Sequence, residues 1–408
     1  MCYARWECGG IGIRSGLKIR LLRDCGFESH HSYQFSLGAA CTPSLLIEGP
    51  TNVTPFDTSL SLDEILIQHV DEMKSFSDYL AACAGQVGVM INSFIPHSDV
   101  HEDINRYLYD PLTKYSENAG KRHRPLICIA ACVAVGGDAD KVASSAAAIE
   151  HFHTAALIHD DIADEAETRR GEPCLHLTQG LGLAINEGDL GLSLVNGTVM
   201  HDPTLDDATK VRVVTELVDM TRRTIEGQAL DLGWARDARY DITEDDYLLM
   251  ATLKTAHYSG AVPLAVGAII GGGSEEQIAA LRQYGLDTGL AFQIQDDLLN
   301  LVGVEEATKK DFRSDITEGK RTLCAVHALS HSDKADRLAE ILSARTTDRA
   351  LLDEAVEIMQ ECGSIDYARA YALNLTSKSK SRMIEVLPES KARDLLVSMA
   401  DWFVSRLY

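Results

Sequence analysis

The sequence predicts an all-α protein, a single large bundle of ten or more helices around a deep central cavity. From Ser59 onward, apolar residues recur at three- and four-residue spacing over almost the whole chain, and no alternating β-branched stretch competes with this helical period. Breaks that contain glycine or proline separate segments of roughly twenty to thirty residues, which is typical of one bundle. The 408 residues, 45% of them hydrophobic, suffice for the core of such a domain.

The helical elements follow one another from Ser59 to the C-terminus. The period is clearest in Leu62–Ala82, Val142–Ile158, Val214–Leu230, Ile278–Leu301 and Leu351–Met359. Residues that favour helix ends stand between such segments, at Gly136-Gly137, His201-Asp202-Pro203, Gly271-Gly272-Gly273 and Gly363-Ser364. Because nothing else interrupts the pattern, we expect residues 59–408 to form one domain.

The first 58 residues differ from the rest. They contain Gly9-Gly10, three prolines and no sustained helical period. Residues 1–40 carry five Lys or Arg against three acids, so the charge balance is +2 there and −25 after them. The stretch from Ile13 to His31 is similar to a translated transfer-RNA gene. We expect residues 1–58 to be a flexible extension, or the product of a start site assigned too far upstream.

The composition excludes several functions. The formal net charge of −23 gives the molecule no overall attraction to nucleic acid or to an anionic membrane. The longest apolar stretches, Pro125–Val135 and Ala261–Ile270, are too short to span a bilayer. Four of the ten cysteines lie at or before residue 41 and the others are scattered without zinc-like spacing, which is typical of reduced thiols. We therefore expect a soluble, cytoplasmic protein.

Two acidic clusters follow apolar helical segments. In the first, Asp160 and Asp164 lie one helical turn apart, with Asp161 beside them, and their repulsion weakens the helix unless a cation offsets it. The second begins with Asp296 and Asp297 in another long helix. On facing helices, two such clusters can hold Mg²⁺ through oxygen ligands and leave positions for phosphate oxygens.

A lone acidic pair is usually only a solvated helix end, and that alternative stands for each cluster taken separately. Here there are two clusters, and basic segments accompany them. Gly120–Pro125 precedes the first cluster, Thr168–Gly171 follows it, and Lys310 and Asp315–Lys320 follow the second. The combination favours a site in which metal ions and fixed cations hold an anionic substrate.

Eight motifs in consistent order resemble the trans-isoprenyl diphosphate synthases, the polyprenyl synthetase family, from about Leu108 to about His327. They are GKRHRP at 120–125, HFHTAALIHDDIAD at 151–164, ETRRG at 167–171, INEGD at 185–189, EGQALDL at 226–232, LKTA at 253–256, FQIQDDLLN at 292–300 and SDITEGKRT at 314–322. Asn300 departs from the family pattern, in which many members carry a third Asp. The QIQDDLLNL form is most similar to geranylgeranyl diphosphate synthases of the eukaryotic type.

The resemblance implies an isoprenoid synthase fold and a head-to-tail condensation. An allylic diphosphate ionises, the double bond of isopentenyl diphosphate attacks the cation, and a proton is lost. The resemblance also implies a homodimer and about three Mg²⁺ ions per site, for which Mn²⁺ can substitute. The residues that it assigns to the metal are Asp160, Asp161, Asp164, Asp296, Asp297 and Asn300.

The resemblance further distributes the substrate contacts. The allylic diphosphate is assigned to Arg169, Lys254 and Lys310, with Lys320 as a further substrate-binding residue. The second diphosphate is assigned to Lys121, Arg124, His153 and Arg170. Thr255 and Gln293 would lie near the reacting carbons, where their dipoles can stabilise positive charge. Local alternatives are surface charge for Lys121 and Arg124, salt bridges for Arg169 and Arg170, a core position for His153, and ordinary helix positions for Thr255 and Gln293.

The helix that carries Asp160 is expected to form the cavity floor that sets product length. Ala155 and Ala156, five and four residues earlier, are too small to stop a C15 chain, and Phe152, one turn deeper, is the first bulky aromatic on that face. The alternative for Phe152 is packing against a neighbouring helix. We expect geranylgeranyl diphosphate as the main product, with a chain of C25 or longer as the alternative.

Two other functions stay open. A class I terpene cyclase would share the first cluster, but its second motif needs Ser or Thr four residues after Asp296 and Glu eight residues after it, where this chain has Asn300 and Val304. A non-catalytic subunit of a heteromeric synthase commonly lacks one acidic cluster, and this chain keeps both. The sequence therefore favours an active synthase.

Overall fold

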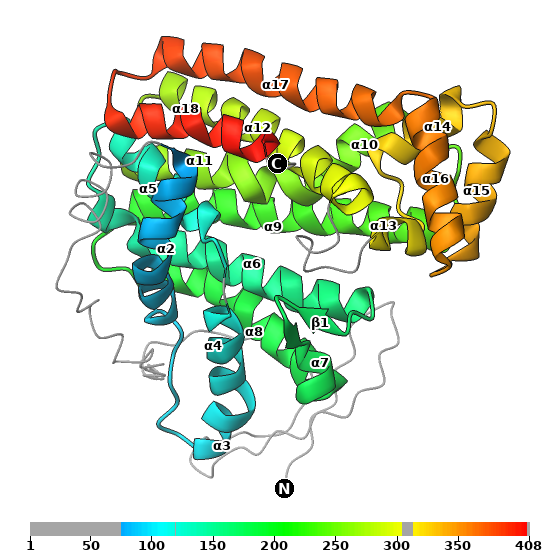
Figure 1. The fold of residues 1–408 in the computed structure, drawn as a ribbon. Helices are drawn as coiled ribbons and strands as arrows, with labels where there is room; N and C mark the ends of the chain where they lie inside the picture. The colour runs from blue at the N-terminus through cyan, green and yellow to red at the C-terminus, as the bar shows by residue number, and fades with distance from the viewer. Residues whose placement is uncertain (1–74, 119, 304–312, 406–408) are drawn as a thin grey trace, which may run out of the picture. The chain divides into compact units, whose positions relative to one another are not determined.

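The computed structural model describes residues 75–118, 120–303 and 313–405. All of them belong to one compact unit, which spans residues 50–408. The described residues are almost entirely helical (Figure 1), so the predicted all-α class is confirmed. The expected extension over residues 1–58 and the candidate residue Lys310 lie outside the described residues, and the domain boundary at residue 58 stays a prediction.

The first half of the described chain contains the helix with the first acidic cluster. Its helical elements are α2 (Phe76–Asn92), α3 (Glu102–Ile104), η1 (Asn105–Tyr109), α4 (Asp110–Glu117), α5 (His123–Ala134), η2 (Ala139–Val142), α6 (Ala143–Ala163), α7 (Leu175–Thr178) and α8 (Leu181–Met200). Helix α6, which ends in the first cluster, packs along α8 and also contacts α2 and α5 (Figure 1).

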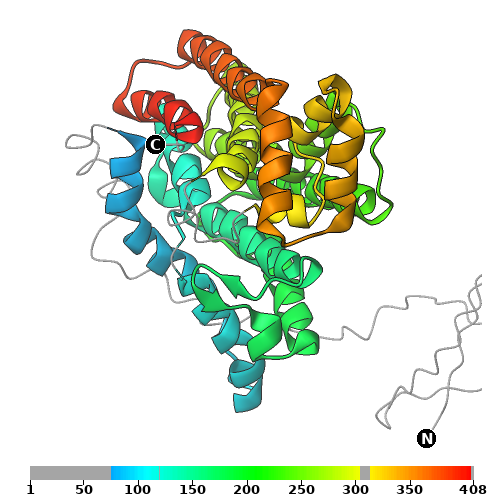
Figure 2. The same ribbon diagram turned by 45° about the vertical axis from the view of Figure 1, so that its right-hand side comes forward.

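The second half contains the helix with the second acidic cluster. Its elements are α9 (Asp207–Arg236), α10 (Glu244–Ala251), η3 (Thr252–Ala261), α11 (Val262–Ile270), α12 (Glu275–Val302), α13 (Ser314–Thr317), α14 (Leu323–His331), α15 (Ala335–Ala344), α16 (Arg349–Glu361), α17 (Ser364–Val386) and α18 (Lys391–Val404). Helix α12 packs against α17 and η3. Figure 2 shows α17 and α18, in orange and red, next to one another.

Local sequence signals account for many of the helix ends. Gly136, Gly272 and Gly363 have φ of 91°, 76° and 76°, a left-handed conformation that glycine adopts without steric penalty at the end of a helix. Helices α10 and α12 begin with capping boxes at Thr243 and Ser274, whose side chains accept hydrogen bonds from the first turn. The predicted breaks therefore coincide with observed helix ends.

Two hydrophobic clusters form the core. One contains residues of α2, α5, α6, α11 and α18. The other contains residues of α10, α12, α14, α15, α16 and α17. Helix α12 contributes to both, with Tyr284 and Phe292 in the first and Ile294 and Leu298 in the second. The helix that carries the second acidic cluster is therefore fixed along most of its length.

A very close helix contact lies between α9 and η3. The ten residues of η3 form a π-helix, a conformation that is frequent at functional sites. A Cβ atom added at Gly227 of α9 would lie 2.2 Å from the backbone nitrogen of Lys254, so this approach requires glycine. The contact brings the 226–232 motif of α9 next to the residues of the 253–256 motif.

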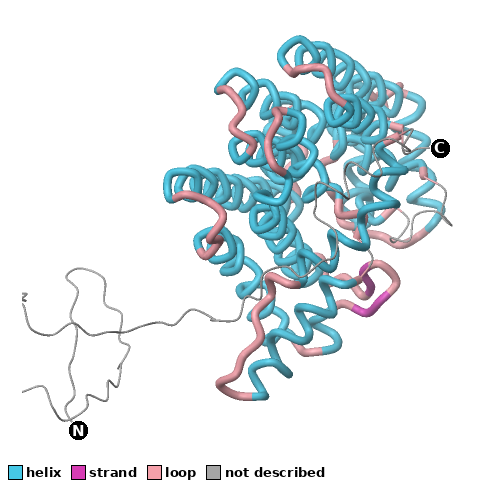
Figure 3. Tube along the Cα trace, turned by 90° about the vertical axis from the view of Figure 1, so that its left-hand side faces the viewer, coloured by secondary structure: helices cyan, strands magenta, loops and turns pink. Residues whose placement is uncertain are grey.

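A short β-hairpin follows α6. Strands β1 (Thr168–Arg169) and β2 (Glu172–Pro173) pair antiparallel, and Figure 3 shows them in magenta as the one strand pair among the described residues. Arg170 and Gly171 make the turn with φ of 57° and 85°. The hairpin holds Arg169 and Arg170 close to the end of the helix that carries the first acidic cluster.

Candidate active site

Asp160 lies near the C-terminal end of α6, where side chains from two other elements contact it. Its Oδ1 accepts a hydrogen bond from Gln228 of α9 at 3.0 Å, and its Oδ2 lies 3.6 Å from the guanidinium of Arg169. Burial acts to raise the pKa of Asp160, but the charges of Lys254 and Lys320 outweigh burial and hold the pKa below its usual value. Asp160 is therefore an ionised carboxylate at neutral pH.

Lys320 joins the end of α6 to the segment that follows α12. Its Nζ lies 3.6 Å from a carboxylate oxygen of Asp164, 3.6 Å from one of Asp315 and 2.5 Å from one of Glu318. Burial acts to lower the pKa of Lys320, yet these three acids, Asp315 first, raise it well above its usual value. A single ammonium group thus connects the first acidic cluster to the 314–322 motif.

Asp161 is held differently from its two neighbours. It is 1% exposed, its Oδ2 accepts from the hydroxyl of Tyr115 at 2.9 Å, and its Oδ1 accepts from Nε of Arg169 at 2.6 Å. The guanidinium of Arg169 forms an ion pair with this carboxylate, so Asp161 is better suited to fix Arg169 beside Asp160 than to bind a cation. Its expected role as a metal ligand stays a prediction.

Lys254 of η3 lies near Asp160, and its charge acts on that carboxylate. Its Nζ donates to Oδ2 of Asp231, one turn along α9 from Gln228, at 2.5 Å. Burial acts to lower the pKa of Lys254, but the charges of Asp231 and Asp160 raise it. A permanently charged ammonium group is therefore held next to the first acidic cluster.

The second cluster is centred on Asp297, which is nearly buried. Tyr247 of α10 donates to its Oδ2 at 2.7 Å, and Nε2 of Gln293 donates to its Oδ1 at 2.7 Å. The hydroxyl of Thr255 in turn donates to Oε1 of Gln293 at 2.5 Å. Burial first, and then the charge of Asp315, raise the pKa of Asp297 to about 8 in spite of its two donors. Burial and the neighbouring acid therefore disfavour the charged form of Asp297.

Asn300 does not join this carboxylate group. Its amide nitrogen donates to the hydroxyl of Ser314 at 3.0 Å, and its amide oxygen accepts from the backbone nitrogen of Asp315 at 3.1 Å. Both ends of the side chain thus hold the start of α13. The expectation that Asn300 is a metal ligand is not supported by this geometry; Asn300 instead positions Asp315 near Asp297.

A second positive region surrounds the N-terminus of α5. Arg124 is buried, donates to the hydroxyl of Ser259 at 2.8 and 3.2 Å, and lies over the ring of Tyr258 at 4.4 Å. Arg170 donates to the backbone oxygen of Asn118 at 2.6 Å. Among the described residues, neither guanidinium forms an ion pair with a carboxylate, which leaves both suited to an anion from outside the protein.

His153 lies in the same region. Its ring stacks on Tyr258 with centroids 5.9 Å apart, and its buried Nδ1 has no hydrogen-bond partner within the described part of the chain. Burial first, and then the charges of Arg124 and Arg170, hold the pKa of His153 well below its usual value. The structure thus brings together three of the four residues expected for the second diphosphate. The fourth, Lys121, is exposed three positions before Arg124, and its Nζ lies over the ring of Trp402, 5.1 Å from the centroid.

The three residues expected to set product length have different surroundings. Phe152 is 2% exposed and its ring packs edge-on against Tyr258, with centroids 5.6 Å apart, as its packing alternative anticipates. Ala155 faces α8, because a Cβ atom added at Gly191 would lie 2.9 Å from the Cβ of Ala155. Ala156 is only partly buried. Of the two alanines, Ala156 is therefore the better placed to meet a substrate chain.

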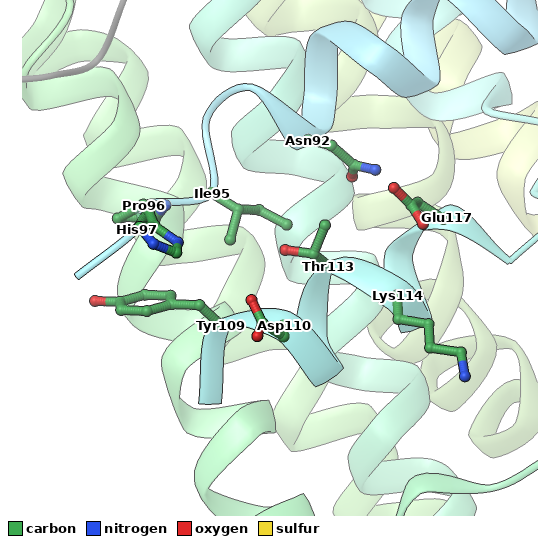
Figure 4. A pocket seen from close by; sticks show the side chains of 9 residues that line it. All are labelled: Asn92, Ile95, Pro96, His97, Tyr109, Asp110, Thr113, Lys114 and Glu117. Atoms are coloured by element: carbon green, nitrogen blue, oxygen red, sulfur yellow. The ribbon is translucent and has the colours of Figure 1, made fainter. Parts of the chain in front are cut away.

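A pocket elsewhere on the molecule has no predicted site residue in its lining. It lies between the end of α2 and α4 (Figure 4), and its lining residues are Asn92, Ile95, Pro96, His97, Tyr109, Asp110, Thr113, Lys114 and Glu117. The candidate active site is therefore defined by its converging charged side chains and not by this pocket.

Comparison with known proteins agrees with this arrangement. Residues 105–359 match the family model described as polyprenyl synthetase. The chain belongs to this family. A short chain isoprenyl diphosphate synthase from Methanothermobacter thermautotrophicus is 42% identical to it over 311 residues, which cover 75% of this chain and 94% of the relative. The protein is therefore a prenyltransferase that acts on isoprenoid diphosphates, as the motifs predict.

Solved structures show the same similarity. The geranylgeranyl pyrophosphate synthetase from Pyrococcus horikoshii OT3 is 34% identical with a TM-score of 0.74, over 81% of this chain and 98% of that one. The geranylgeranyl pyrophosphate synthase from Corynebacterium glutamicum, complexed with isoprenyl diphosphate and magnesium, is 28% identical with a TM-score of 0.70, over 85% and 100%. The isoprenoid synthase fold is thereby confirmed.

The donor set fits the divalent metal that this family uses. Asp160, Asp164, Asp296 and Asp297 offer carboxylate oxygens, which hard divalent cations prefer. Burial and Asp315 disfavour the charged form of Asp297, and a cation bound beside it would favour that form. Lys320 occupies the position between Asp164 and Asp315 and partly offsets the same charge.

Several residues of this site were not singled out from the sequence. Gln228 and Asp231 lie in the quoted 226–232 motif, and their spacing of three residues, which places them on one helix face, was the available signal. Tyr115 and Tyr247 are 46 and 50 residues from their partners, and no local pattern indicates such pairs. Tyr258, which contacts Arg124, is visible only in the structure.

Proposed function

We propose that the protein is a geranylgeranyl diphosphate synthase, which condenses isopentenyl diphosphate with allylic diphosphates. The observation that carries this proposal is the presence of two anion sites of different kinds. One combines carboxylates with Lys254 and Arg169. The other contains Arg124 and Arg170, which form no ion pair with a carboxylate of the described residues. A condensation of two diphosphates, of which only one leaves, requires this difference.

The reaction divides between these two sites. In the first, the C–O bond of the allylic diphosphate breaks and the electron pair leaves with the diphosphate, whose charge Lys254, Arg169 and Lys320 stabilise. In the second, Arg124, Arg170, Lys121 and the neutral His153 hold isopentenyl diphosphate so that its double bond can form the new C–C bond. The proton that the product loses is accepted by the released diphosphate.

We assign Mg²⁺ to the carboxylates Asp160, Asp164, Asp296 and Asp297, with about three ions as the number to be tested. When bound, such ions stabilise the departing diphosphate as Lewis acids. The Corynebacterium glutamicum structure, complexed with isoprenyl diphosphate and magnesium, supports the assignment. The hydroxyl of Thr255 and the amide of Gln293, bonded to one another, are assigned to the wall near the reacting carbons, where their dipoles stabilise positive charge.

Geranylgeranyl diphosphate is the proposed product because small residues follow one another where the chain grows. Ala156 leaves room for a C15 primer, and Phe152, fixed against Tyr258, is the proposed floor. The name of the Pyrococcus horikoshii relative supports the same length. A product of C25 or longer is the second candidate, since alanines at positions 155 and 156 would also admit it.

The deciding experiment measures incorporation of labelled isopentenyl diphosphate by the purified chain with geranyl or farnesyl diphosphate and Mg²⁺, followed by product analysis. A C20 diphosphate as the main product is expected. Cyclised hydrocarbon would indicate a terpene cyclase, and no incorporation by a folded chain would indicate a non-catalytic subunit. A main product of C10 or C15 would refute the proposal that Ala155 and Ala156 leave room for a longer chain.

We also propose that the protein is a homodimer that pairs through α9. Val211, Val218, Ile225 and Leu232 recur every seven residues on this helix and are 62%, 50%, 57% and 38% exposed. A seven-residue apolar repeat on one face is typical of helices that pair with a copy of themselves. Light scattering should give a dimer for the native chain and a monomer for Val218→Glu/Ile225→Glu, while Val89→Glu, at an exposed valine of α2, should stay dimeric.

The cellular location follows from less direct observations. Within the described ranges, no helix is both long and apolar enough to cross a membrane. Five of the six described cysteines are buried, and all six are free thiols. These features support a cytoplasmic location, which fractionation of the source cells would test.

A further inference from the structure

A group of potential metal ligands lies on α14 and α10. His327 and His331 stand one turn apart on α14, and Glu244 is the first residue of α10. One ligand atom from each of the three lies within 4.8 Å of the others. None of these residues belongs to the acidic clusters of the candidate active site.

Hydrogen bonds fix the orientation of both rings. Nδ1 of His331 lies 2.9 Å from the backbone oxygen of His327, and because a carbonyl oxygen can only accept, Nδ1 carries the proton. Nδ1 of His327 bonds to the hydroxyl of Ser364 at 2.8 Å. A serine hydroxyl can accept as well as donate, so Nδ1 of His327 can carry its proton as well. In that tautomer both Nε2 atoms have lone pairs for a metal, as in sites where a second contact sets the histidine tautomer.

The carboxylate is oriented in a similar way. Tyr367 of α17 donates to Oε2 of Glu244 at 2.5 Å, which leaves Oε1 as the available ligand atom. The ring of Tyr367 also stacks on His327, with centroids 4.3 Å apart, and the rings of His327 and His331 stack at 4.1 Å.

We propose that Glu244, His327 and His331 form a binding site for a transition-metal ion of the Zn²⁺ class, separate from the carboxylates of the active site. Two imidazoles and one carboxylate are the ligands that Zn²⁺, Co²⁺ and Ni²⁺ take, whereas Mg²⁺ requires oxygen ligands. Two histidines four residues apart on one helix are a recurrent zinc-binding pair. A water molecule completes the fourth position.

The site would connect three helices around the second hydrophobic cluster. Glu244 belongs to α10, the two histidines to α14, and their hydrogen-bond partners Ser364 and Tyr367 to α17. Ligand atoms of a tetrahedral zinc site are about 3.3 Å apart, so the present set must close by roughly 1.5 Å at most. Because His331 is exposed, its side chain can move without disturbing the core. The role of the metal is therefore to stabilise the fold.

The test uses the full chain, freed of metal and kept in saturating Mg²⁺ so that the active-site carboxylates are occupied. Isothermal titration with Zn²⁺ should give one tight site per chain, and Co²⁺ should show the strong visible absorption of tetrahedral coordination. Zn²⁺ should also raise the melting temperature, because it binds only the folded chain at this site. The absence of a tight site in the native chain would overturn the proposal.

Variants separate this site from adventitious binding. His331→Ala should weaken Zn²⁺ binding at least about 100-fold and abolish the melting shift, and Tyr367→Phe, which keeps every ligand, should weaken binding about tenfold. His201→Ala is the matched control, because His201 is also exposed and its Nδ1 also contacts the oxygen four residues earlier, at 2.8 Å. Equal Zn²⁺ affinity in His331→Ala and the control would refute the site, and prenyl transfer in Mg²⁺ is not involved in either outcome.

Discussion

The hydroxyl of Tyr247 donates a hydrogen bond to Asp297 across 2.7 Å, between α10 and α12. This donor favours the charged form of a carboxylate whose pKa is already raised by burial and by Asp315. The bond therefore keeps Asp297 available to a cation that must compete with a proton.

Removal of this donor should weaken the metal site. In Tyr247→Phe, loss of a hydrogen bond to a charged group, worth about 1.5–3 kcal/mol, should raise the Mg²⁺ concentration for half-maximal activity about tenfold. The maximal rate at saturating Mg²⁺ should stay close to that of the native enzyme. Magnesium titrations of activity check this, with Tyr240→Phe as a control at a partly buried tyrosine bonded to Ser343. An unchanged half-maximal concentration would contradict the role of the bond.

The carboxylates should divide into metal ligands and anchors. Asp160→Ala and Asp296→Ala should lower kcat at least about 100-fold with the fold intact, because each removes charge stabilisation of the leaving group. Asp287→Ala, on the same helix as Asp296, should have little effect on kcat. Steady-state kinetics and circular dichroism decide this, and near-normal turnover of both site variants without added metal would end the assignment.

Asp161 provides a separate prediction. Asp161→Asn should retain Mg²⁺ affinity yet lower kcat, because Arg169 loses the carboxylate that holds it beside Asp160. The loss should be smaller than that of Asp160→Ala. A large increase in the Mg²⁺ requirement of Asp161→Asn would instead make Asp161 a direct ligand, as the sequence motif alone suggested.

The two diphosphate sites should be separable by kinetics. Lys121→Ala should mainly raise KM for isopentenyl diphosphate, because this residue lies at the exposed edge of the arginine group. Lys254→Ala should mainly lower kcat, because the leaving group loses its ammonium partner. KM and kcat measured with each substrate varied in turn check the division. The same defect in both variants toward both substrates would show that the sites are not distinct.

Product length should respond to Ala156 and Phe152. Ala156→Phe should shift the product toward C15. Phe152→Ala should lengthen the product and also lower the free energy of unfolding by about 3–5 kcal/mol, because Phe152 is buried against Tyr258. Ala155→Phe should also shorten the product, but its side chain would collide with α8 at Gly191 and should destabilise the protein as well. Product analysis and thermal melts of the three variants test this order.

Acid should destabilise the protein through a buried histidine. Burial first, and then the charge of Arg122, lower the pKa of His151 to about 4, against 6.5 for an unperturbed histidine. Between these values the unfolded chain binds a proton that the folded chain does not, so stability is lost as pH falls from 6.5 to 4 and is constant above that range. The loss is about 2 kcal/mol between pH 7.5 and pH 5, and His151→Gln should remove it in denaturation curves measured at these two pH values. Equal pH dependence in the two proteins would exclude His151 as the cause.

Most of the fold and the family of the site were predictable because their signals are local. The helical period identified α6, α9, α12 and α16, and the motif order placed Asp160 and Asp297 in one site. The roles of Asp161 and Asn300 were not predictable, since they depend on Tyr115, 46 residues away, and on Ser314 beyond a loop. A sequence motif specifies which side-chain oxygen atoms are present, whereas tertiary contacts decide whether those atoms are available to bind a metal ion.

The π-helical winding of η3 allows one short segment to contact both substrates. In a π-helix, each backbone hydrogen bond joins residues that are five positions apart. Lys254 and Ser259, the partner of Arg124, have this spacing and therefore lie one above the other on the same side of η3. In an ordinary α-helix, five residues at about 100° each would turn these side chains roughly 140° apart. A deletion of one residue within Thr252–Ala261 that restored the tighter winding would thus leave every functional residue in the chain and still separate the ionising substrate from its acceptor.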